Sequence, residues 1–141
     1  MEPFSYVEGG PPADLTVEAH GSTLGEAFGN AALAMFNAMT PLGGVNEREI
    51  KRVEATGDDL EGLLYNFLDE LLYVHEVELL VFSSVAVSIN EENLELNAEC
   101  QGEKFDPQRH ESGIVVKAVT FHQMKIERQK SGFTLRVVFD T

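Results

Sequence analysis

Three carboxylates near the two ends of the sequence could together bind a metal cation. Asp14 stands directly before the alternating stretch 15–19, and Asp140 precedes Thr141, the last residue. Taken alone, Asp14 has the position of a turn former. If the two ends met, two aspartates and the α-carboxylate of Thr141 would repel each other unless a cation or a lysine lay among them. Such all-oxygen ligands favour calcium or magnesium over zinc or copper.

A lysine inside an apolar stretch is the second candidate functional residue. Residues 114–122 are rich in β-branched and aromatic types and predict a strand. Alternation along that strand would place Lys117 on the same face as Val115 and Val119. An ammonium group in apolar surroundings is costly unless it is paired. Either the lysine stem runs along the sheet to solvent, or an anion of this chain or of a partner meets it.

No standard catalytic motif accompanies these residues. The sequence contains no G-x-S-x-G, no phosphate-binding G-x-x-x-x-G-K-S/T, no H-E-x-x-H and no C-x-x-C. The four histidines are scattered without the spacing of metal ligands: His20, His75, His110 and His122. The single cysteine, Cys100, cannot form an internal disulfide, which suits a reducing compartment. We therefore expect a cytoplasmic protein.

The net charge of −14, from 24 acidic and 10 basic residues, limits the classes of partner. It argues against direct, non-specific nucleic-acid binding, which requires many lysines and arginines to neutralise phosphates. An acidic surface suits cations or a basic protein partner, although solubility alone would also explain it. We expect no membrane association, because no apolar segment reaches about 18 residues and the start lacks a signal-peptide pattern.

Two amphipathic segments predict the helices. Thr23 and Glu26 form a capping box at the start of the first helix, which should end before Pro41. Asp58 or Asp59 should cap the second helix, where leucines recur at i, i+3, i+4 and i+7. We expect the methionines of the first helix in the core, and a partner-binding stripe is the alternative.

The predicted strands and helices together indicate the fold class. Paired glycines and prolines at 9–12 predict a loop, and strands are expected at 4–8, 15–19, 49–56, 79–89, 94–100, 114–122 and 133–139. The order β-α-β-α, followed by sequential strands, predicts an α+β fold. In it, two main helices cover one face of a mixed or mostly antiparallel sheet. The length of 141 residues and the lack of a linker predict a single domain, residues 1–141.

Motifs along nearly the whole chain resemble the archease family. They are Ala13–Asp14, Thr23–Phe28, Ala31–Phe36, Met39–Thr40, Asp58–Leu60, Leu63–Leu64, Phe67–Leu72, Gly102–Glu103, His110, Val116–His122 and Val138–Thr141. The most specific part of the resemblance is the block from Lys117 to His122. Two positions depart from the family pattern: Pro11–Pro12 replaces the usual His-Thr before the first aspartate, and Thr141 stands where an aliphatic residue is usual.

The resemblance implies an accessory protein and not an enzyme. Archeases assist the RtcB-type RNA ligase of tRNA splicing: they promote guanylylation of its active-site histidine, support multiple turnover and broaden its use of nucleoside triphosphates. Membership would imply a site for calcium, or another hard divalent cation, at Asp14, Asp140 and Thr141. It would also make Lys117 the functionally important lysine.

Two other functions remain open on the sequence. One is a stand-alone metal-dependent hydrolase that uses the same carboxylates with His122 as the base. The other is a general chaperone or scaffold that binds its partners through the methionine-bearing helix 24–39.

Overall fold

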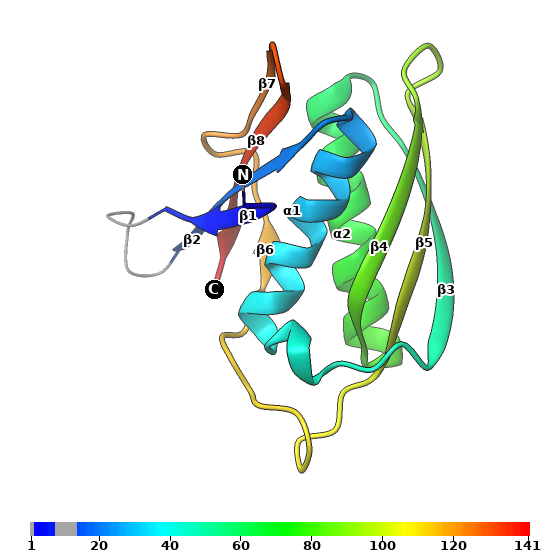
Figure 1. Ribbon diagram of the computed structural model, residues 1–141, viewed down its shortest axis with the longest axis vertical. Helices are drawn as coiled ribbons and strands as arrows, with labels where there is room; N and C mark the ends of the chain where they lie inside the picture. The colour runs from blue at the N-terminus through cyan, green and yellow to red at the C-terminus, as the bar shows by residue number, and fades with distance from the viewer. Residues whose placement is uncertain (1, 8–13) are drawn as a thin grey trace.

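The computed structural model describes residues 2–7 and 14–141, and in it two helices lie between two antiparallel sheets (Figure 1). The five-stranded sheet is formed by β1 (Phe4–Tyr6), β2 (Asp14–Gly21), β6 (Ala118–Val119), β7 (Lys125–Gln129) and β8 (Gly132–Asp140). Its order is β1-β2-β8-β6, and β7 also pairs with β8. The three-stranded sheet, in the order β3-β5-β4, is formed by β3 (Glu49–Thr56), β4 (Leu80–Asn90) and β5 (Glu95–Lys104).

The α+β class is confirmed, but the strands divide into two sheets instead of forming one. Helices α1 (Leu24–Met39) and α2 (Leu60–Glu78) each contact strands of both sheets, but α2 keeps an exposed face that includes Asp69, Tyr73 and Val77. The predicted loop at 9–12, including Pro11–Pro12, lies outside the described residues. None of the described helices is long and apolar enough to cross a membrane.

The helices begin where their caps predict. The Thr23 hydroxyl oxygen accepts a hydrogen bond from the Glu26 main-chain N–H at 3.1 Å, and the Glu26 carboxylate accepts one from the Ser22 hydroxyl at 2.9 Å. At the second helix Asp59 is the cap, and its Oδ1 accepts from the Gly62 N–H at 2.7 Å. Both helices therefore start from signals that can be read in the sequence.

The core lies between the sheets and is built around aromatic pairs. Phe28 of α1 and Phe67 of α2 stack with centroids 6.3 Å apart, and Phe36 meets Phe82 of β4 edge to face at 5.2 Å. Met35 and Met39 are buried in the same core. The alternative of a methionine-bearing partner face on helix 24–39 is therefore wrong, because the two sheets already cover that helix.

The strand predicted at 114–122 is mostly irregular, and only Ala118–Val119 pairs with β8. The reason lies just before it: the N–H groups of Gly113 and Ile114 donate to the Met39 and Ala38 carbonyls at 2.7 and 2.9 Å. The chain therefore runs first to the C-terminal end of α1. Regular alternation is lost, and the predicted faces are wrong.

The burial of individual side chains shows the consequence for the lysine. Val116 and Val119 are buried, whereas Val115 and Lys117 are exposed. Lys117 therefore shares no apolar face with Val119, and its ammonium group reaches solvent without the cost of burial.

Helix α1 approaches β4 closely through its glycines. A Cβ added at Gly25 would lie 2.5 Å from the Val87 carbonyl oxygen, and one at Gly29 would lie 2.8 Å from the Val85 carbonyl oxygen. Both neighbours are main-chain atoms of a paired strand, so they cannot turn aside as a side chain would. The distance between α1 and the three-stranded sheet thus depends on the absence of side chains at these positions.

We expect Gly25→Ala to lower the free energy of unfolding by about 1–3 kcal/mol, because the added methyl group pushes α1 away from β4. This cost should exceed the gain of about 1 kcal/mol in helix propensity. Urea unfolding followed by circular dichroism would measure it. The control is Gly43→Ala, where nothing lies within 4 Å of the added Cβ and the change should stay within about 0.5 kcal/mol. A Gly25→Ala variant as stable as the parent would contradict the close approach.

Candidate functional site

The two ends of the chain meet at one end of the five-stranded sheet. Asp14 stands directly opposite Asp140 in the antiparallel pair β2–β8, and Ala118 of β6 stands opposite Asp140 on the other side. Directly opposite residues project from the same face with Cβ atoms roughly 4.5–5.5 Å apart. Figure 1 shows the C-terminus at this end, beside the start of β2. The predicted meeting of Asp14 and Asp140 is confirmed.

Lys117 lies next to this row of residues. Its main-chain N–H donates a hydrogen bond to the Asp140 carbonyl oxygen at 2.7 Å. Its side chain is exposed and takes part in none of the ion pairs found among the described residues. We call Asp14, Asp140, Thr141 and Lys117 the acidic tip.

The two carboxylates of the acidic tip point away from the core. Along β8, Leu135, Val137 and Phe139 are buried toward the helices. Asp140 therefore belongs to the alternate, outward set, together with Asp14 opposite it. Asp140 is exposed and Asp14 is half-buried, so ions and partners can reach both carboxylates.

The side chains of the acidic tip cannot by themselves complete a metal site. Within residues 2–7 and 14–141, no three His, Cys, Asp or Glu side chains lie close enough to hold an ion. A cation bound by Asp14 and Asp140 would need further oxygens, such as the carboxylate of Thr141, main-chain carbonyls or water. Calcium accepts all of these as ligands.

His122 lies apart from the two carboxylates. The Thr120 N–H donates to the Val138 carbonyl oxygen at 3.1 Å. Thr120 therefore already lies beside a residue two positions before Asp140 on β8, and His122 comes two residues after Thr120. His122 follows Ala118, the residue opposite Asp140, by four positions and lies in the turn after β6, so it is placed poorly to serve as a base beside Asp140.

A buried ionic cluster around Glu103 was not expected from the sequence. Glu103, near the end of β5, is only 5% exposed. Its carboxylate accepts a hydrogen bond from the Asn46 N–H at 2.6 Å, pairs with the guanidinium of Arg109 and lies 3.0 Å from His110 Nε2. Arg48 Nε lies 3.5 Å from the other carboxylate oxygen. One side chain thus joins β5 to loops 41–48 and 105–117.

The hydrogen bonds of His110 define its protonation. The Asp106 main-chain N–H donates to His110 Nδ1 at 2.8 Å, so this nitrogen must carry a lone pair. The proton therefore sits on Nε2, which donates to Glu103. The ring of Phe105 stacks on the imidazole at 5.5 Å. Both ring nitrogens of the buried His110 are thus engaged in contacts within the protein, which indicates a structural role.

The pKa of Glu103 reflects opposing effects. Burial raises it, but the hydrogen bonds from Arg109, the Asn46 N–H and His110, together with the charge of Arg109, lower it further than burial raises it. The net result is a pKa of about 2, against an ordinary value of 4.5. The carboxylate therefore stays ionised across the physiological range and holds loop 105–117 in place.

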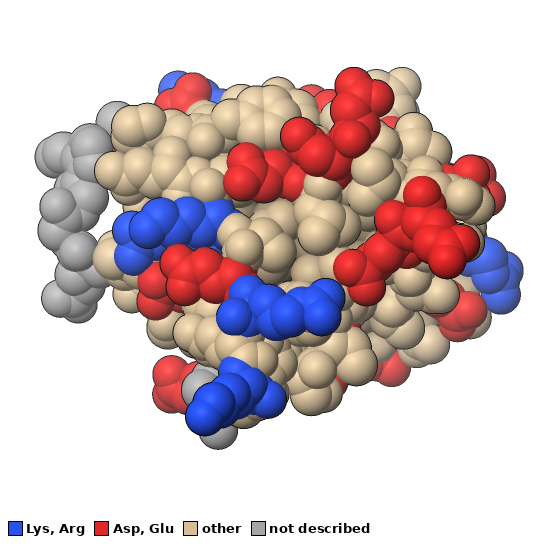
Figure 2. Space-filling model, turned by 90° about the horizontal axis from the view of Figure 1, so that it is seen from above, with Lys and Arg blue, Asp and Glu red and all other residues tan. Residues whose placement is uncertain are grey.

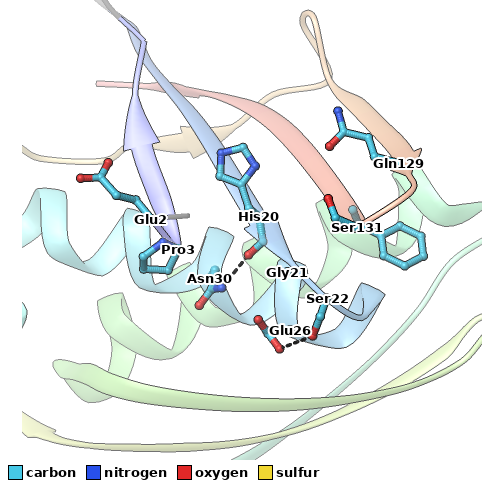
Figure 3. Close-up of a pocket in the computed structure, with 10 residues that line it drawn as sticks. Glu2, Pro3, His20, Gly21, Ser22, Glu26, Asn30, Gln129 and Ser131 are labelled. Atoms are coloured by element: carbon cyan, nitrogen blue, oxygen red, sulfur yellow. Dashed lines mark hydrogen bonds between the residues drawn. The ribbon is translucent and has the colours of Figure 1, made fainter.

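A cavity of about 290 Å³ lies at the opposite end of β2 from Asp14 (Figure 3). None of the four acidic-tip residues contributes to its wall, so it is separate from the candidate site. The residues that line it come from the N-terminal segment, the β2–α1 junction and the β7–β8 turn: Glu2, Pro3, His20, Gly21, Ser22, Glu26, Asn30, Gln129, Ser131 and Phe133.

The polar groups in this cavity mostly bind each other. The Asn30 amide donates to the His20 carbonyl at 2.7 Å, as Figure 3 shows. The Thr134 hydroxyl donates to Gln129 Oε1 at 3.0 Å and must therefore accept from His20 Nδ1 at 3.1 Å. These bonds tie His20 of β2 to α1 on one side and to the β7–β8 hairpin on the other.

The surface charge is distributed unevenly. Figure 2 shows acidic side chains spread over the upper end of the molecule, with the basic ones gathered mainly toward the five-stranded sheet. On that sheet, Arg136 pairs with Glu18 at 3.0 Å, and Arg128 lies 5.0 Å from the ring centroid of Phe133. Some of the few lysines and arginines are thus engaged in contacts within the protein.

Comparison with known proteins identifies clear relatives. Residues 4–141 match the profile of the archease protein family. A protein archease from Sulfurisphaera tokodaii is 43% identical over 140 residues, with 99% of each chain covered. One from Pyrococcus furiosus is 45% identical over 127 residues, covering 85% of this chain and 86% of its own.

Two solved structures share the fold. A solution structure of a protein from Methanobacterium thermoautotrophicum has a TM-score of 0.86 and 40% identity, with all of both chains covered. A crystal structure of a Thermotoga maritima archease, described as a possible chaperone, has a TM-score of 0.62 and 21% identity, with 92% of this chain and 91% of that chain covered. At that identity the second structure supports the fold alone.

Glu103 should make the fold sensitive to acid. Because its pKa is lowered in the folded state, the carboxylate stabilises the fold above about pH 4.5, and this contribution is lost as the pH falls toward about 2. Glu103→Gln should lower the free energy of unfolding at pH 7 by about 2 kcal/mol. It should also reduce the stability difference between pH 7 and pH 3, measured by urea unfolding at both values.

The matched control is Glu99→Gln on the same strand. Glu99 forms only an exposed pair with Arg52 at 3.5 Å, so its loss should cost less than about 0.5 kcal/mol. If Glu103→Gln kept the full acid sensitivity of the parent protein, another carboxylate would be responsible.

Proposed function

Because this chain belongs to the archease family, we propose that it is an accessory protein of an RtcB-type RNA ligase in tRNA splicing and not itself the ligase. In this role it promotes guanylylation of the ligase's active-site histidine, supports multiple turnover and broadens the accepted nucleoside triphosphates. The observation that carries the proposal is the acidic tip. Asp14, Asp140 and Lys117 come from distant parts of the sequence and share one exposed end of the sheet.

We further propose that Asp14, Asp140 and the carboxylate of Thr141 hold a calcium ion or another hard divalent cation. The donor chemistry fits, since all the ligands are oxygens and two of them are carboxylates. Like charges directly opposite each other in a sheet are destabilising, and a bound cation would offset that repulsion. Its role in the proposal is to fix the carboxylates of the tip.

Lys117 is the residue of the tip proposed to act on the ligase. Its main-chain N–H is fixed on Asp140, while its ammonium group is exposed at the edge of the molecule. An ammonium group is a mobile point charge suited to phosphate oxygens. In the proposed complex the tip enters the ligase cleft, where Lys117 helps to position a nucleoside triphosphate. Nucleotidyl transfer depends mainly on such positioning and on charge stabilisation.

We expect Lys117→Ala and Asp140→Asn each to reduce the stimulation of ligase guanylylation by at least about tenfold, since each removes a charge that the reaction needs. Transfer of radiolabelled GMP from GTP to the cognate ligase measures this, and circular dichroism confirms the fold. Lys125→Ala, which removes an exposed lysine from the same sheet, is the control and should stimulate fully. Undiminished stimulation by both tip variants would overturn the proposal. Turnover of GTP by the protein alone would instead favour the stand-alone hydrolase.

The proposed metal site predicts calcium binding that depends on both aspartates. Titration calorimetry on the metal-free protein should show one calcium site, and Asp14→Asn or Asp140→Asn should weaken it by at least about tenfold. Asp69→Asn, an exposed aspartate on α2, should leave the affinity unchanged. Equal calcium affinity in all of these proteins would mean that calcium binds elsewhere or only diffusely.

A further inference from the structure

A groove of about 310 Å³ opens at the end of the molecule where α1 and α2 finish and β4 begins. Its wall is mainly apolar and includes Met39, Leu79, Val81, Phe105 and Val115. The single charged residue in the wall is Glu76, whose side chain is exposed. Nothing in the proposed chemistry of the acidic tip uses this groove.

Several apolar side chains at the groove face water. Val115 is 71% exposed, Leu79 55% and Ile114 43%, and all three line the groove. Soluble proteins tolerate single exposed apolar residues, but a contiguous cluster at a concave surface is typical of an interaction site. Burying such side chains against a partner is favourable in proportion to the area removed from water.

Leu79 is held in an unfavourable conformation. It follows α2 with φ of +61°, a left-handed conformation in which glycine or asparagine is usual at the end of a helix. The bonds that this turn needs are made by the main chain: Leu79 N–H to the His75 oxygen at 2.9 Å, and Phe105 N–H to the Leu79 oxygen at 2.7 Å. The fold therefore does not require a leucine side chain here, and strain of this kind is typical of functional positions.

The groove is physically continuous with the acidic tip. Residues 112–116 line the groove, and the next residue is Lys117, whose N–H is bound to the Asp140 carbonyl. The start of the same segment is bound to the end of α1 through Gly113 and Ile114. Because one segment forms both the groove wall and the lysine of the tip, the two surfaces adjoin and a single partner can contact both.

We propose that this groove docks a segment of the ligase that the tip serves, with an apolar side chain in the groove and a neighbouring lysine or arginine facing Glu76. The inference rests on the proposed function, since the partner is the same protein. The apolar wall selects the anchoring side chain. The carboxylate of Glu76 and the net charge of −14 select a basic neighbour. The groove supplies affinity, and the tip supplies the charged groups.

The test compares Leu79→Asn and Val115→Ser with Ile50→Ser, in full-length protein with the full-length cognate ligase. Ile50 is 57% exposed on β3, does not line the groove, and serves as the control for loss of an exposed apolar side chain. Calorimetry should show about a tenfold or greater rise in Kd for the two groove variants and none for the control. The melting temperature of Leu79→Asn should equal or exceed that of the parent, because asparagine tolerates the left-handed conformation better.

The guanylylation assay separates the groove from the tip. At saturating concentration, Leu79→Asn and Val115→Ser should recover full stimulation, whereas Lys117→Ala should not. Unchanged Kd in both groove variants would overturn the docking inference and leave the proposed function standing, provided that the parent protein stimulates the ligase. If the parent neither binds nor stimulates the ligase, the proposed function itself fails. A homodimer in sedimentation experiments that Val115→Ser dissociates would assign the groove to a second copy and overturn the inference.

Discussion

The pairing of β2 with β8 is the interaction on which the candidate site depends. Eight consecutive residue pairs, from Gly21 opposite Phe133 to Asp14 opposite Asp140, hold the two strands in register. A shift of one residue would turn every side chain to the other face, sending core residues such as Val17 into water. Burial of the inner face therefore fixes which residues meet on the outer face. The hydrophobic core thus determines that two carboxylates lie side by side at the end of the sheet.

A second constraint determines where Lys117 lies. Loop 105–117 has little regular structure, and its position depends on contacts at its two ends. Near its start, the buried Glu103 carboxylate binds Arg109 and the buried imidazole of His110. Toward its end, the segment is bound to α1 and then to Asp140 by main-chain hydrogen bonds. Loops held at both ends in this way can present functional side chains as precisely as regular structure does.

The sequence predicts the local features of this fold well and the non-local ones poorly. The capping residues Thr23 and Asp59 and the strand at 49–56 follow from local propensity and periodicity. The division into two sheets does not follow from these local signals, because which strands pair depends on how both helices pack against them. The strand predicted at 114–122 is wrong for a related reason: the main-chain bonds of Gly113 and Ile114 to α1 override a strong strand propensity.

Within the candidate site, too, some contacts could be expected before the structure was known and others could not. The meeting of Asp14 with Asp140 was expected from the family resemblance, because lying at the start and the end of alternating strands does not by itself pair two residues. The Glu103 cluster was not expected, because a glutamate at the end of a strand gives no sign that it will be buried. The signal that could have indicated burial is the density of hydrogen-bonding partners in the following loop, where Arg109 and His110 are adjacent in sequence. That signal identifies Arg109 and His110 as possible partners of a buried carboxylate. It does not show that they bind Glu103, because this contact requires the loop to fold back onto β5.

The charge distribution gives a physical reason for the proposed division of labour between the two proteins. A chain with net charge −14 is repelled by RNA at distances up to a Debye length, about 8 Å at physiological ionic strength. It would therefore not compete with a ligase for the RNA substrate, whereas the basic cleft of a nucleotide-binding partner would attract it. Attraction between the acidic surface and this cleft would bring the exposed Lys117, with Asp14 and Asp140 beside it, into the cleft. On this proposal the acidity of the protein and the cationic group of its tip act together: the first selects the binding partner, and the second meets the phosphates inside it.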